Sequence, residues 1–439
     1  MARHLRTILF RRATLRAFFR VLKADGPVGT WRRGWAFIRR TRAAADAHSA
    51  PLSNHPPPLL QFWSDMSAAQ VMTTHKAPAL LTRHRVIAMI GDLNLQQCKK
   101  YRIEQPTELW GAIGVDYRFS HFEDVPRCID IMQGATHLML YRLQRHDLVT
   151  SYLYEARRLR LPVLYDIDDP MFSVEAYATY GNMDALPPDA RHHFLGQAPL
   201  YLDILNAADI TSFSTPVLRD HAMSLSPRPG FVRRNFADRD TLASGLRAAE
   251  TARSEKAATD GFTLCFASGS HGHEVDFQMI APQVEAFLDA APDRKLLVLG
   301  HFQSDLLSDT LRNRVVTRPF SDYATYLGHL ARADAAVMPL ADDLFNRCKS
   351  GVRVIDAAAA GVPAIVGTVG DLAAMIEPGK TGFIAEKPQD WATALDTLAA
   401  DKAMASRMGR DARLALEDLW SARASQPIIE PELVAWVKE

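Results

Sequence analysis

A polar loop between two apolar segments carries residue types that can bind phosphate groups. The strand-like run 335–339 precedes the loop ADDLFNRCKSG, residues 341–351, and a helix-like run follows at 352–360. Such a loop brings the N-terminus of a helix to the carboxyl edge of a parallel sheet, where free backbone N–H groups attract anions. We therefore expect the N–H groups from Lys349 through Gly351 to Val352, together with the Lys349 ammonium, to bind a diphosphate.

An aspartate lies about one turn further along the same helix. Asp356 is flanked by Ile355 and four alanines, an apolar setting in which an unpaired carboxylate is costly. A carboxylate at this place in a nucleotide-binding α/β domain accepts hydrogen bonds from ribose hydroxyls. The alternative is an ordinary amphipathic helix that Ser350 caps and whose Asp356 is solvated.

A second group of carboxylates follows the strand-like segment 162–167. Asp166, Asp168 and Asp169 are close enough in sequence to suit Mg²⁺ or Mn²⁺. We favour a different interpretation, in which Asp168 or Asp169 orients a hydroxyl group of a substrate. The other aspartate then caps the turn before Pro170 through backbone hydrogen bonds.

A glycine-containing loop, SGSHGHEVD, spans residues 268–276 after another strand-like segment. Glycine lets the backbone approach a phosphate closely, so Ser268 and Gly269 are candidate ligand-binding residues. His273 is a candidate for positive charge there, although a loop histidine is often simply solvated. Arg102 and Arg142 are further cationic candidates, and a surface salt bridge is the alternative for Arg142.

Short apolar strands alternate with helical stretches along two parts of the chain. Residues 84–236 and 260–400 each show this pattern, which predicts parallel sheets covered by helices. Residues 276–290 are predicted to form one of these helices. We predict an α/β protein with two Rossmann-like domains that face a cleft. Residues 237–260 are polar and rich in alanine, and we interpret them as the crossing between the domains.

The charge is unevenly distributed. The net charge is +1, but residues 1–50 hold twelve basic and two acidic side chains, or +10, which leaves −9 for residues 51–439. Residues 1–42 mix arginines with apolar residues at helical spacing, which predicts a basic helical arm that lies on an anionic membrane. The alternative is a helix that packs on the body or on a partner. A nucleic acid is not expected, because the acidic body would repel it.

The remaining N-terminal and compositional features exclude several classes of protein. Residues 43–60 contain Pro56, Pro57 and Pro58 and are predicted to be a linker, so the arm and linker together span 1–60. The four cysteines form no C-x-x-C pair, which indicates neither a disulfide framework nor a zinc site. Arginines interrupt every apolar run near the N-terminus. We expect a cytoplasmic protein, with a peripheral position at the inner face of the membrane as one alternative.

Residues 354–385, VIDAAAAGVPAIVGTVGDLAAMIEPGKTGFIA, resemble the donor-binding signature of glycosyltransferase family 4, or group 1. Asp356 stands at the second glutamate of the family's E-x7-E pair, and Gly361 and Pro363 also match. Cys348 stands where the first glutamate is expected. The loop FNRCKSG instead resembles a divergent subgroup with an F-N-x-x-K-S motif, in which Asn346, Lys349 and Ser350 would contact the sugar and the phosphates.

Four other stretches are similar to motifs of that subgroup: CKKYRI at 98–103, LYDIDDPMF at 164–172, VRRNFAD at 232–238 and ASGSHGHEVDF at 267–277. The resemblance covers about 84–420. It implies the GT-B fold, with residues 84–236 as the acceptor domain, 260–400 as the nucleotide-sugar domain and the helices of 401–439 crossing back to the first domain. Tyr101 and Arg102 of the first motif, with Arg142, would lie on the acceptor side.

The resemblance also implies an activity. We expect transfer of a sugar from a nucleotide-diphosphate sugar to an acceptor hydroxyl, with retention of configuration and with no metal or other cofactor. The acceptor would be a glycan or a lipid-linked sugar in bacterial surface polysaccharide or glycolipid assembly. One alternative is a catalytically silent GT-B module that binds a nucleotide sugar or a partner enzyme. A dehydrogenase is disfavoured, because GDLNLQ rather than G-x-G-x-x-G follows the strand at 86–90.

Overall fold

The computed structural model describes residues 58–68, 84–94, 99–257, 261–269, 273–302, 308, 312–425 and 427–439. The chain separates into two compact units, Met1–Gln61 and Phe62–Glu439. The predicted arm at 1–42 and most of the predicted linker lie outside the described residues. The linker prediction is wrong for residues 58–60, which begin helix α3 (Pro58–Ala68). Proline is tolerated at the first helical position, where its missing N–H would have no intrahelical partner.

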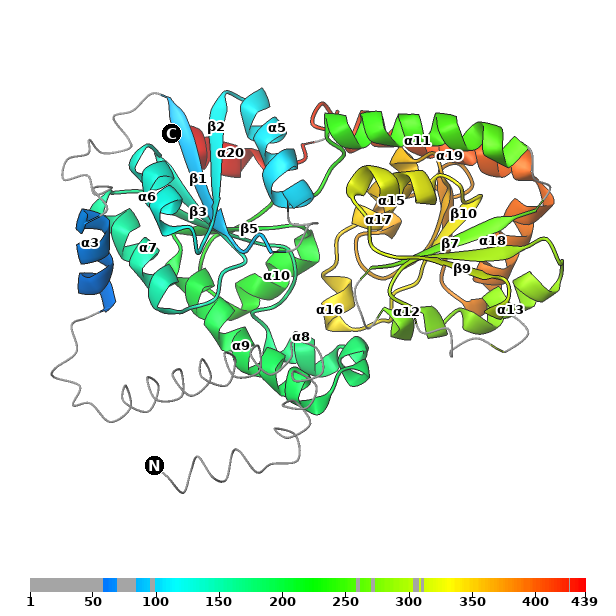
Figure 1. The fold of residues 1–439 in the computed structure, drawn as a ribbon, viewed down its shortest axis with the longest axis horizontal. Coiled ribbons are helices and arrows are strands. Elements are labelled where there is room, and N and C mark those ends of the chain that lie inside the picture. Colours follow the sequence, from blue (N-terminus) through cyan, green and yellow to red (C-terminus); the bar gives the residue numbers. More distant parts are fainter. Residues whose placement is uncertain are drawn as a thin grey trace, which may run out of the picture. The chain divides into compact units, whose positions relative to one another are not determined.

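The unit Phe62–Glu439 contains two six-stranded sheets in which every strand pair is parallel (Figure 1). The first sheet has the order β2-β1-β3-β4-β5-β6. Its strands are β1 (Arg85–Gly91), β2 (Val115–His121), β3 (His137–Tyr141), β4 (Val163–Ile167), β5 (Ile210–Phe213) and β6 (Gly230–Val232). The prediction of parallel, helix-covered sheets is confirmed.

Alternation along β1 explains why helices cover both faces of the first sheet. Val86, Ala88 and Ile90 belong to one apolar layer, which includes residues of α6 and α7. Ile87 and Met89 belong to the opposite layer, which includes α5 and α20. Successive side chains of a strand point to opposite faces, so a strand that is apolar throughout needs cover on both.

The helices of the first half connect these strands. They are the π-helical turn η3 (Lys100–Glu104), α5 (Gln105–Ala112), α6 (Val125–Gln133), α7 (Asp147–Arg158), α8 (Val174–Thr179), the 3₁₀ turn η4 (Gly181–Ala185), α9 (Pro188–Ala207) and α10 (Pro216–Leu225). The N-terminus of α10 follows the sequence signal: the Thr215 hydroxyl accepts a hydrogen bond from the Leu218 N–H, and Pro216 occupies the first turn.

The second sheet has the order β12-β11-β10-β7-β8-β9. Its strands are β7 (Thr263–Gly269), β8 (Lys295–Gly300), β9 (Val315–Arg318), β10 (Ala335–Met338), β11 (Ala364–Gly367) and β12 (Gly382–Ala385). The order runs outward in both directions from the β10–β7 pair. Loops that leave these two strands diverge to opposite sides, and ligands bind in the crevice that such a reversal opens at the carboxyl ends.

The helices of the second half include one that the sequence did not predict. They are α11 (Arg239–Ala257), α12 (Glu274–Gln278), α13 (Ala281–Asp289), α15 (Tyr323–Leu330), α16 (Leu344–Arg347), α17 (Val352–Ala359), the 3₁₀ turn η6 (Ala373–Met375), α18 (Pro388–Ala400), α19 (Lys402–Leu419) and α20 (Pro431–Lys438). Helix α11 occupies the predicted crossing 237–260 and packs against α15 and α17. One predicted helix, 276–290, is instead two helices, α12 and α13.

The C-terminal residues return to the first sheet. Ile429 forms an isolated antiparallel bridge with Arg233. Leu433 and Val437 of α20 are fully buried in the layer that contains Ile87 and Met89. One face of the first sheet is therefore covered by α5 and α20, which lie far apart in the sequence. None of the described helices is long and apolar enough to cross a membrane.

Candidate donor and acceptor sites

The loop between β10 and α17 crosses the carboxyl edge of the second sheet at the reversal of strand order. Asp343 caps the short helix α16 by accepting a hydrogen bond from the Asn346 N–H. Gly351 is the N-cap of α17, and no side chain caps this helix. A side chain at Gly351 would place its Cβ 2.4 Å from the Met375 sulfur. Ser350 is therefore not the helix cap, and the N–H groups of the first turn have no capping side chain.

Asn346 is fully buried and its amide orientation is fixed by its partners. The amide nitrogen donates to Asp276 Oδ1 at 3.2 Å, to Ala341 O at 3.0 Å and to Asp343 Oδ2 at 2.9 Å. All three partners are acceptors, so the amide group can take only this orientation. Its oxygen is buried and has no partner among the described residues. A buried acceptor left open in this way suits a ligand hydroxyl.

Asp276 joins the loop after β7 to the loop after β10. Its Oδ1 also accepts from the Ala341 N–H at 3.0 Å, and its Oδ2 lies 3.1 Å from His273 Nδ1 and accepts from Asn182 Nδ2 at 3.1 Å. Burial opposes ionisation, but the His273 hydrogen bond and the charge of Lys349 lower the pKa of Asp276 to about 2. The fixed carboxylate therefore holds the two loops of the second sheet together.

His273 does not supply the positive charge considered for it from the sequence. Burial lowers the pKa of this imidazole to about 4, although the hydrogen bond with Asp276 raises it. The ring is neutral near pH 7 and orients Asp276. Ser268, at the end of β7, is 1% exposed, and its hydroxyl has no partner among the described residues. Gly269 ends β7 after a register shift and pairs with Gly300 of β8.

Lys349 is the cation of the loop, and aromatic rings surround it. Its ammonium donates to Tyr180 Oη at 2.9 Å and lies 4.8 Å from the centre of the Tyr180 ring and 5.7 Å from that of Phe345. The two rings stack at 4.2 Å. Burial lowers the pKa of Lys349 to about 8, although Asp276 raises it. No described carboxylate forms an ion pair with Lys349, so the structure leaves its charge available for an anionic ligand.

Asp356 is 5% exposed and lies among tyrosine hydroxyls. Tyr323 Oη donates to Asp356 Oδ1 at 2.6 Å, and Tyr101 Oη lies 3.4 and 3.3 Å from the two carboxylate oxygens. Burial raises the pKa of this carboxyl to about 7, against the hydrogen bonds of Tyr323, Tyr101 and Tyr326. The solvated alternative for Asp356 is therefore wrong.

The aspartates after β4 have separate environments. Asp166 is 1% exposed and accepts from Arg233 Nη2 at 2.7 Å and from Ser212 Oγ at 2.5 Å. Arg102 Nε lies 3.1 Å from the same carboxylate. Asp166 is therefore fully engaged in the interior of the first sheet.

Asp168 and Asp169 lie nearer the surface. Tyr141 Oη donates to Asp168 Oδ2 at 3.1 Å, and Arg102 Nη2 lies 3.4 Å from that oxygen. Burial opposes the ionisation of Asp168, but Arg102 and Arg142 lower its pKa. Burial and the charge of Asp168 raise the pKa of Asp169, whose one ion pair among the described residues is a 3.7 Å contact with Arg142. Of the two, Asp169 keeps the less compensated carboxylate.

Arg102 and Arg142 differ in what they contribute. Arg102 is 1% exposed, stacks 5.4 Å above the Tyr141 ring and donates to Asn235 Oδ1 at 2.6 Å. It holds other residues in place. Arg142 has a positive φ of 52°, a strained conformation for a residue with a side chain, and contacts both Asp168 and Asp169. Such strain commonly occurs where a loop serves a binding site.

Hydrogen bonds join residues of the first sheet domain to the loop before α17. Asn235 Nδ2 donates to Ser350 Oγ at 2.8 Å, and Thr215 Oγ1 donates to Cys348 O at 2.9 Å. Together with the Lys349–Tyr180 and Asp276–Asn182 contacts, they bring the motifs F-N-x-x-K-S, H-x-x-D-F and V-R-R-N to one place. The structure thus assembles the expected donor residues around one loop.

Several residues at this place were not selected from the sequence. Asp276 belongs to the motif ASGSHGHEVDF at 267–277. Its position three residues after His273 was a signal that the two side chains could contact each other. Tyr180 and Asn182 belong to the irregular segment after β4, and nothing in their spacing indicated contact with the second domain. Arg353 lies in the first turn of α17, four residues after Lys349 of the preceding loop, and this spacing of two cations at one helix N-terminus was a usable signal.

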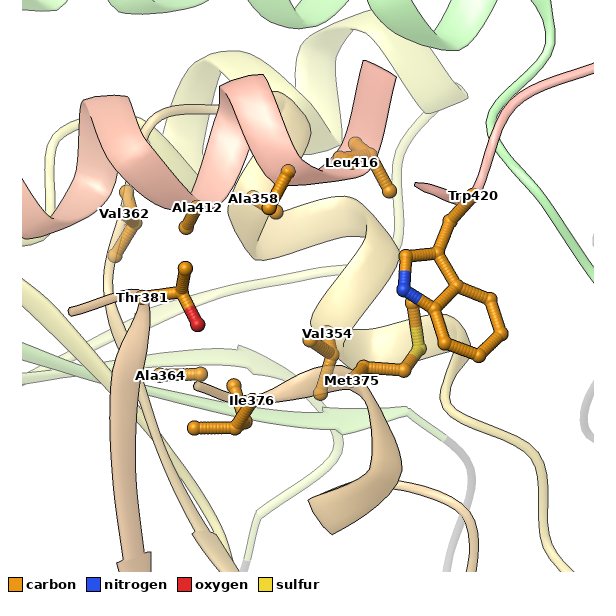
Figure 2. Close-up of a pocket in the computed structure, with 11 residues that line it drawn as sticks. Val354, Ala358, Val362, Ala364, Met375, Ile376, Thr381, Ala412, Leu416 and Trp420 are labelled. Carbon is orange, nitrogen blue, oxygen red and sulfur yellow. The ribbon is translucent and has the colours of Figure 1, made fainter. Parts of the chain in front are cut away.

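The pocket drawn in Figure 2 lies on another side of α17. Val354 and Ala358 of α17 line it with Leu416 and Trp420 near the end of α19 (Figure 2). Its polar side-chain atoms are the indole nitrogen of Trp420 and the hydroxyl of Thr381, which accepts from the Glu377 N–H at 2.8 Å. An apolar gap of this kind provides no group to bind a phosphate. Among the described residues, no cluster of three or more His, Cys, Asp or Glu is arranged to hold a metal ion.

Comparisons with known proteins agree with this geometry. Residues 262–401 match the family described as glycosyl transferases group 1. The match contains β7, β10, the loop before α17 and Asp356. It identifies a glycosyltransferase domain in this part of the chain. No curated protein matches the chain.

Solved structures show the fold of the whole pair of domains. Sucrose-phosphate synthase from Thermosynechococcus elongatus is similar with a TM-score of 0.50 and 16% identity, over 77% of this chain and 95% of that one. Anabaena HepE in complex with UDP-glucose gives 0.50 and 13%, over 77% and 96%. A glycosyltransferase from Rickettsia africae gives 0.52 and 12%, over 78% and 95%. The protein has the GT-B glycosyltransferase fold.

Proposed function

We propose that the protein transfers a sugar from a nucleotide-diphosphate sugar to an acceptor hydroxyl, with retention of the anomeric configuration. The observation that carries the proposal is Lys349, a half-buried ammonium with which no described carboxylate forms an ion pair. It stands immediately before the uncapped N-terminus of α17, within the segment that matches the glycosyltransferase family. A diphosphate would satisfy both the ammonium and the free N–H groups.

The residues around the leaving group would stabilise the negative charge that develops on it. As the bond from the anomeric carbon to the donor phosphate breaks, negative charge grows on the diphosphate. The fixed N–H groups of α17 and the Lys349 ammonium would stabilise this charge without reorganisation. The open amide oxygen of Asn346 would accept a hydrogen bond from a sugar hydroxyl. The carboxyl group of Asp356, which the tyrosine hydroxyls orient, would accept hydrogen bonds from the ribose hydroxyls of the donor.

The acceptor side would use the aspartates after β4. Asp169 keeps the less compensated carboxylate, and the charge of Lys349 acts on it. It would orient the acceptor hydroxyl or the transferred sugar, while Asp168, Arg102 and Arg142 would hold this side of the site in shape. Tyr101, expected on the acceptor side, has its hydroxyl on Asp356 and would instead orient that carboxyl group. By resemblance to family 4, the donor phosphate would take the acceptor proton, and no metal would be needed.

The experiment that tests the proposal begins with the full-length protein and a panel of nucleotide sugars in a thermal-shift assay. The donor that stabilises the protein is then supplied with candidate glycan or lipid-linked acceptors, and transfer and hydrolysis are measured. We expect Lys349→Ala and Asp356→Ala to lose transfer by about 100-fold or more while circular dichroism still shows a folded protein. Lys380→Ala is the matched control, because Lys380 is an exposed lysine of the same domain.

Wild-type turnover in both variants would contradict the proposal. Donor binding with neither transfer nor hydrolysis would instead support a silent binding module. The anomeric configuration of the product, read by NMR, tests retention. Sedimentation with anionic and zwitterionic vesicles tests whether the basic residues 1–42 bring the protein to a membrane, where a surface polysaccharide or glycolipid would be assembled.

A further inference from the structure

Arg353 has a side chain that its surroundings do not satisfy. It is the second residue of α17, one turn after Lys349. Its Nη1 nitrogen is buried and has no hydrogen-bond partner among the described residues. Buried guanidinium nitrogens are normally paired, and one without a partner costs free energy comparable to a lost hydrogen bond.

The charges near Arg353 make this cost larger. The positive end of the α17 dipole disfavours a cation in the first turn, and the Lys349 ammonium is near enough to act on it electrostatically. Asp276 is the carboxylate whose charge acts on both cations. Its two oxygens are already occupied by Ala341, Asn346, Asn182 and His273. Asp169 and Asp343 act on Lys349 only from a distance, so two cations and a helix N-terminus share one place where no described carboxylate forms an ion pair with either cation.

A phosphate group would remove all three costs at once. Its oxygens would accept hydrogen bonds from Arg353 Nη1 and from the free N–H groups of α17. Its negative charge would also neutralise the Lys349 ammonium. Ser268 supports the same location, since its buried hydroxyl at the end of β7 also has no partner among the described residues. A hydroxyl can donate to a phosphate oxygen from the opposite side of the strand-order reversal.

We propose that Arg353 is a second phosphate-binding residue and that it and Lys349 hold the diphosphate of the donor between them. This inference rests on the proposed function and adds a residue to it. Arg353 would bind the phosphates directly through its guanidinium, and its charge would balance the second negative charge of the leaving nucleoside diphosphate. Lys349 alone balances only one.

The test measures the phosphate contribution separately from the nucleoside. UDP, GDP and ADP are titrated into the full-length wild type by calorimetry. The tightest of them is then compared with its nucleoside and with inorganic pyrophosphate in the variants Arg353→Gln, Arg353→Lys and Arg347→Gln. Arg347→Gln is the matched control, because Arg347 is 54% exposed on the same loop and pairs with Asp342 at 2.6 Å.

We expect Arg353→Gln to weaken the nucleoside diphosphate and pyrophosphate by about 10- to 100-fold and to leave the nucleoside unchanged. Arg353→Lys should restore part of the loss, and Arg347→Gln should bind like the wild type. Thermal melting should show Arg353→Gln to be at least as stable as the wild type.

Three results would overturn the inference. The first is unchanged pyrophosphate binding in Arg353→Gln. The second is an equal loss of nucleoside and diphosphate in both Arg353 variants, which indicates a structural role. The third is a wild type that binds none of the diphosphates, which also overturns the proposed function. If diphosphate binding depends on Arg353 but no sugar is transferred or hydrolysed, the proposed function fails and the inference stands.

Discussion

The carboxyl edges of the two sheets differ in whether their charged side chains form ion pairs. At the first edge, the carboxylate of Asp166 meets two arginines, Arg102 and Arg233, and a serine hydroxyl. At the second edge, Lys349 and Arg353 meet no ion-pairing carboxylate among the described residues, and Asp276 is occupied by other donors. In the first cluster each charge has an ion-pairing partner of opposite sign, although Arg233 Nε and Nη1 have no hydrogen-bond partner among the described residues. In the second cluster the two cations gain such a partner only when an anion binds, and this difference in charge pairing separates a structural cluster from a binding site.

The largest expected effect comes from breaking the ion-paired cluster around Asp166. Asp166→Ala leaves Arg233 without its carboxylate and Arg102 with only the 3.4 Å contact to Asp168, so we expect the free energy of unfolding to fall by about 3 to 5 kcal/mol. Urea denaturation followed by circular dichroism measures it. Asp116→Ala is the control, because Asp116 is 52% exposed on β2. A loss below about 1 kcal/mol in Asp166→Ala would show that the cluster is not the structural element described.

A second prediction concerns Asp356, which has hydroxyl partners but no ion pair. Its pKa is about 7 in the folded protein, mainly because of burial, and about 3.9 when unfolded. The folded state therefore binds more protons between these values, and stability is lost as pH rises from about 4 to 7. Relative to Asp356→Asn, wild-type stability should fall by about 2 to 4 kcal/mol between pH 4.5 and 8.

Denaturation curves at several pH values measure this difference. Asp396→Asn is the control, since Asp396 is 68% exposed in the same domain and should follow the wild type at every pH. Parallel pH profiles for wild type and Asp356→Asn would show that Asp356 titrates normally. The three tyrosine hydroxyls would then satisfy the ionised carboxylate fully.

The smallest effect has the opposite sign. Lys349→Met removes a half-buried charge that has no ion-pairing partner among the described residues, so stability at pH 7 should stay level or rise by up to about 2 kcal/mol. The folded pKa of about 8 lies below the unfolded value of about 10.4, so the unfolded state binds more protons between them. The gain from Lys349→Met should therefore shrink as pH rises from 8 to 10. A loss of stability above about 1 kcal/mol at pH 7 would show that the protein itself stabilises the Lys349 charge, as it does the charges around Asp166.

Much of the fold was predictable because the strands are apolar on both faces. Runs such as 86–90 and 335–338 allow few structures other than a buried parallel strand. Helix α11 was missed because its sequence is polar and rich in alanine, which fits an exposed crossing as well as a helix. The break between α12 and α13 was missed because Pro282 was accepted inside a longer helix, although proline favours a first turn.

The candidate site was predictable where its residues share one loop. One helix terminus brings together Asn346, Lys349, Ser350 and Asp356, because these residues lie close to one another in the sequence. Contacts between the two sheets, such as Asn182 with Asp276, depend on how distant segments pack, and no local periodicity records this. Charge states were also hidden from the sequence: the neutrality of His273 results from burial, which only the assembled structure reveals.

The packing of the C-terminal residues has a consequence for how the protein is made. Ile428, Ile429, Leu433 and Val437 belong to the same buried layer as Ile87, Met89 and Trp110. A ribosome synthesises β1 first and these residues only after the entire second sheet. One face of the first sheet must therefore wait uncovered during translation, when exposed apolar surface promotes aggregation. A chaperone, or the rapid folding of the second sheet domain, would shorten that interval.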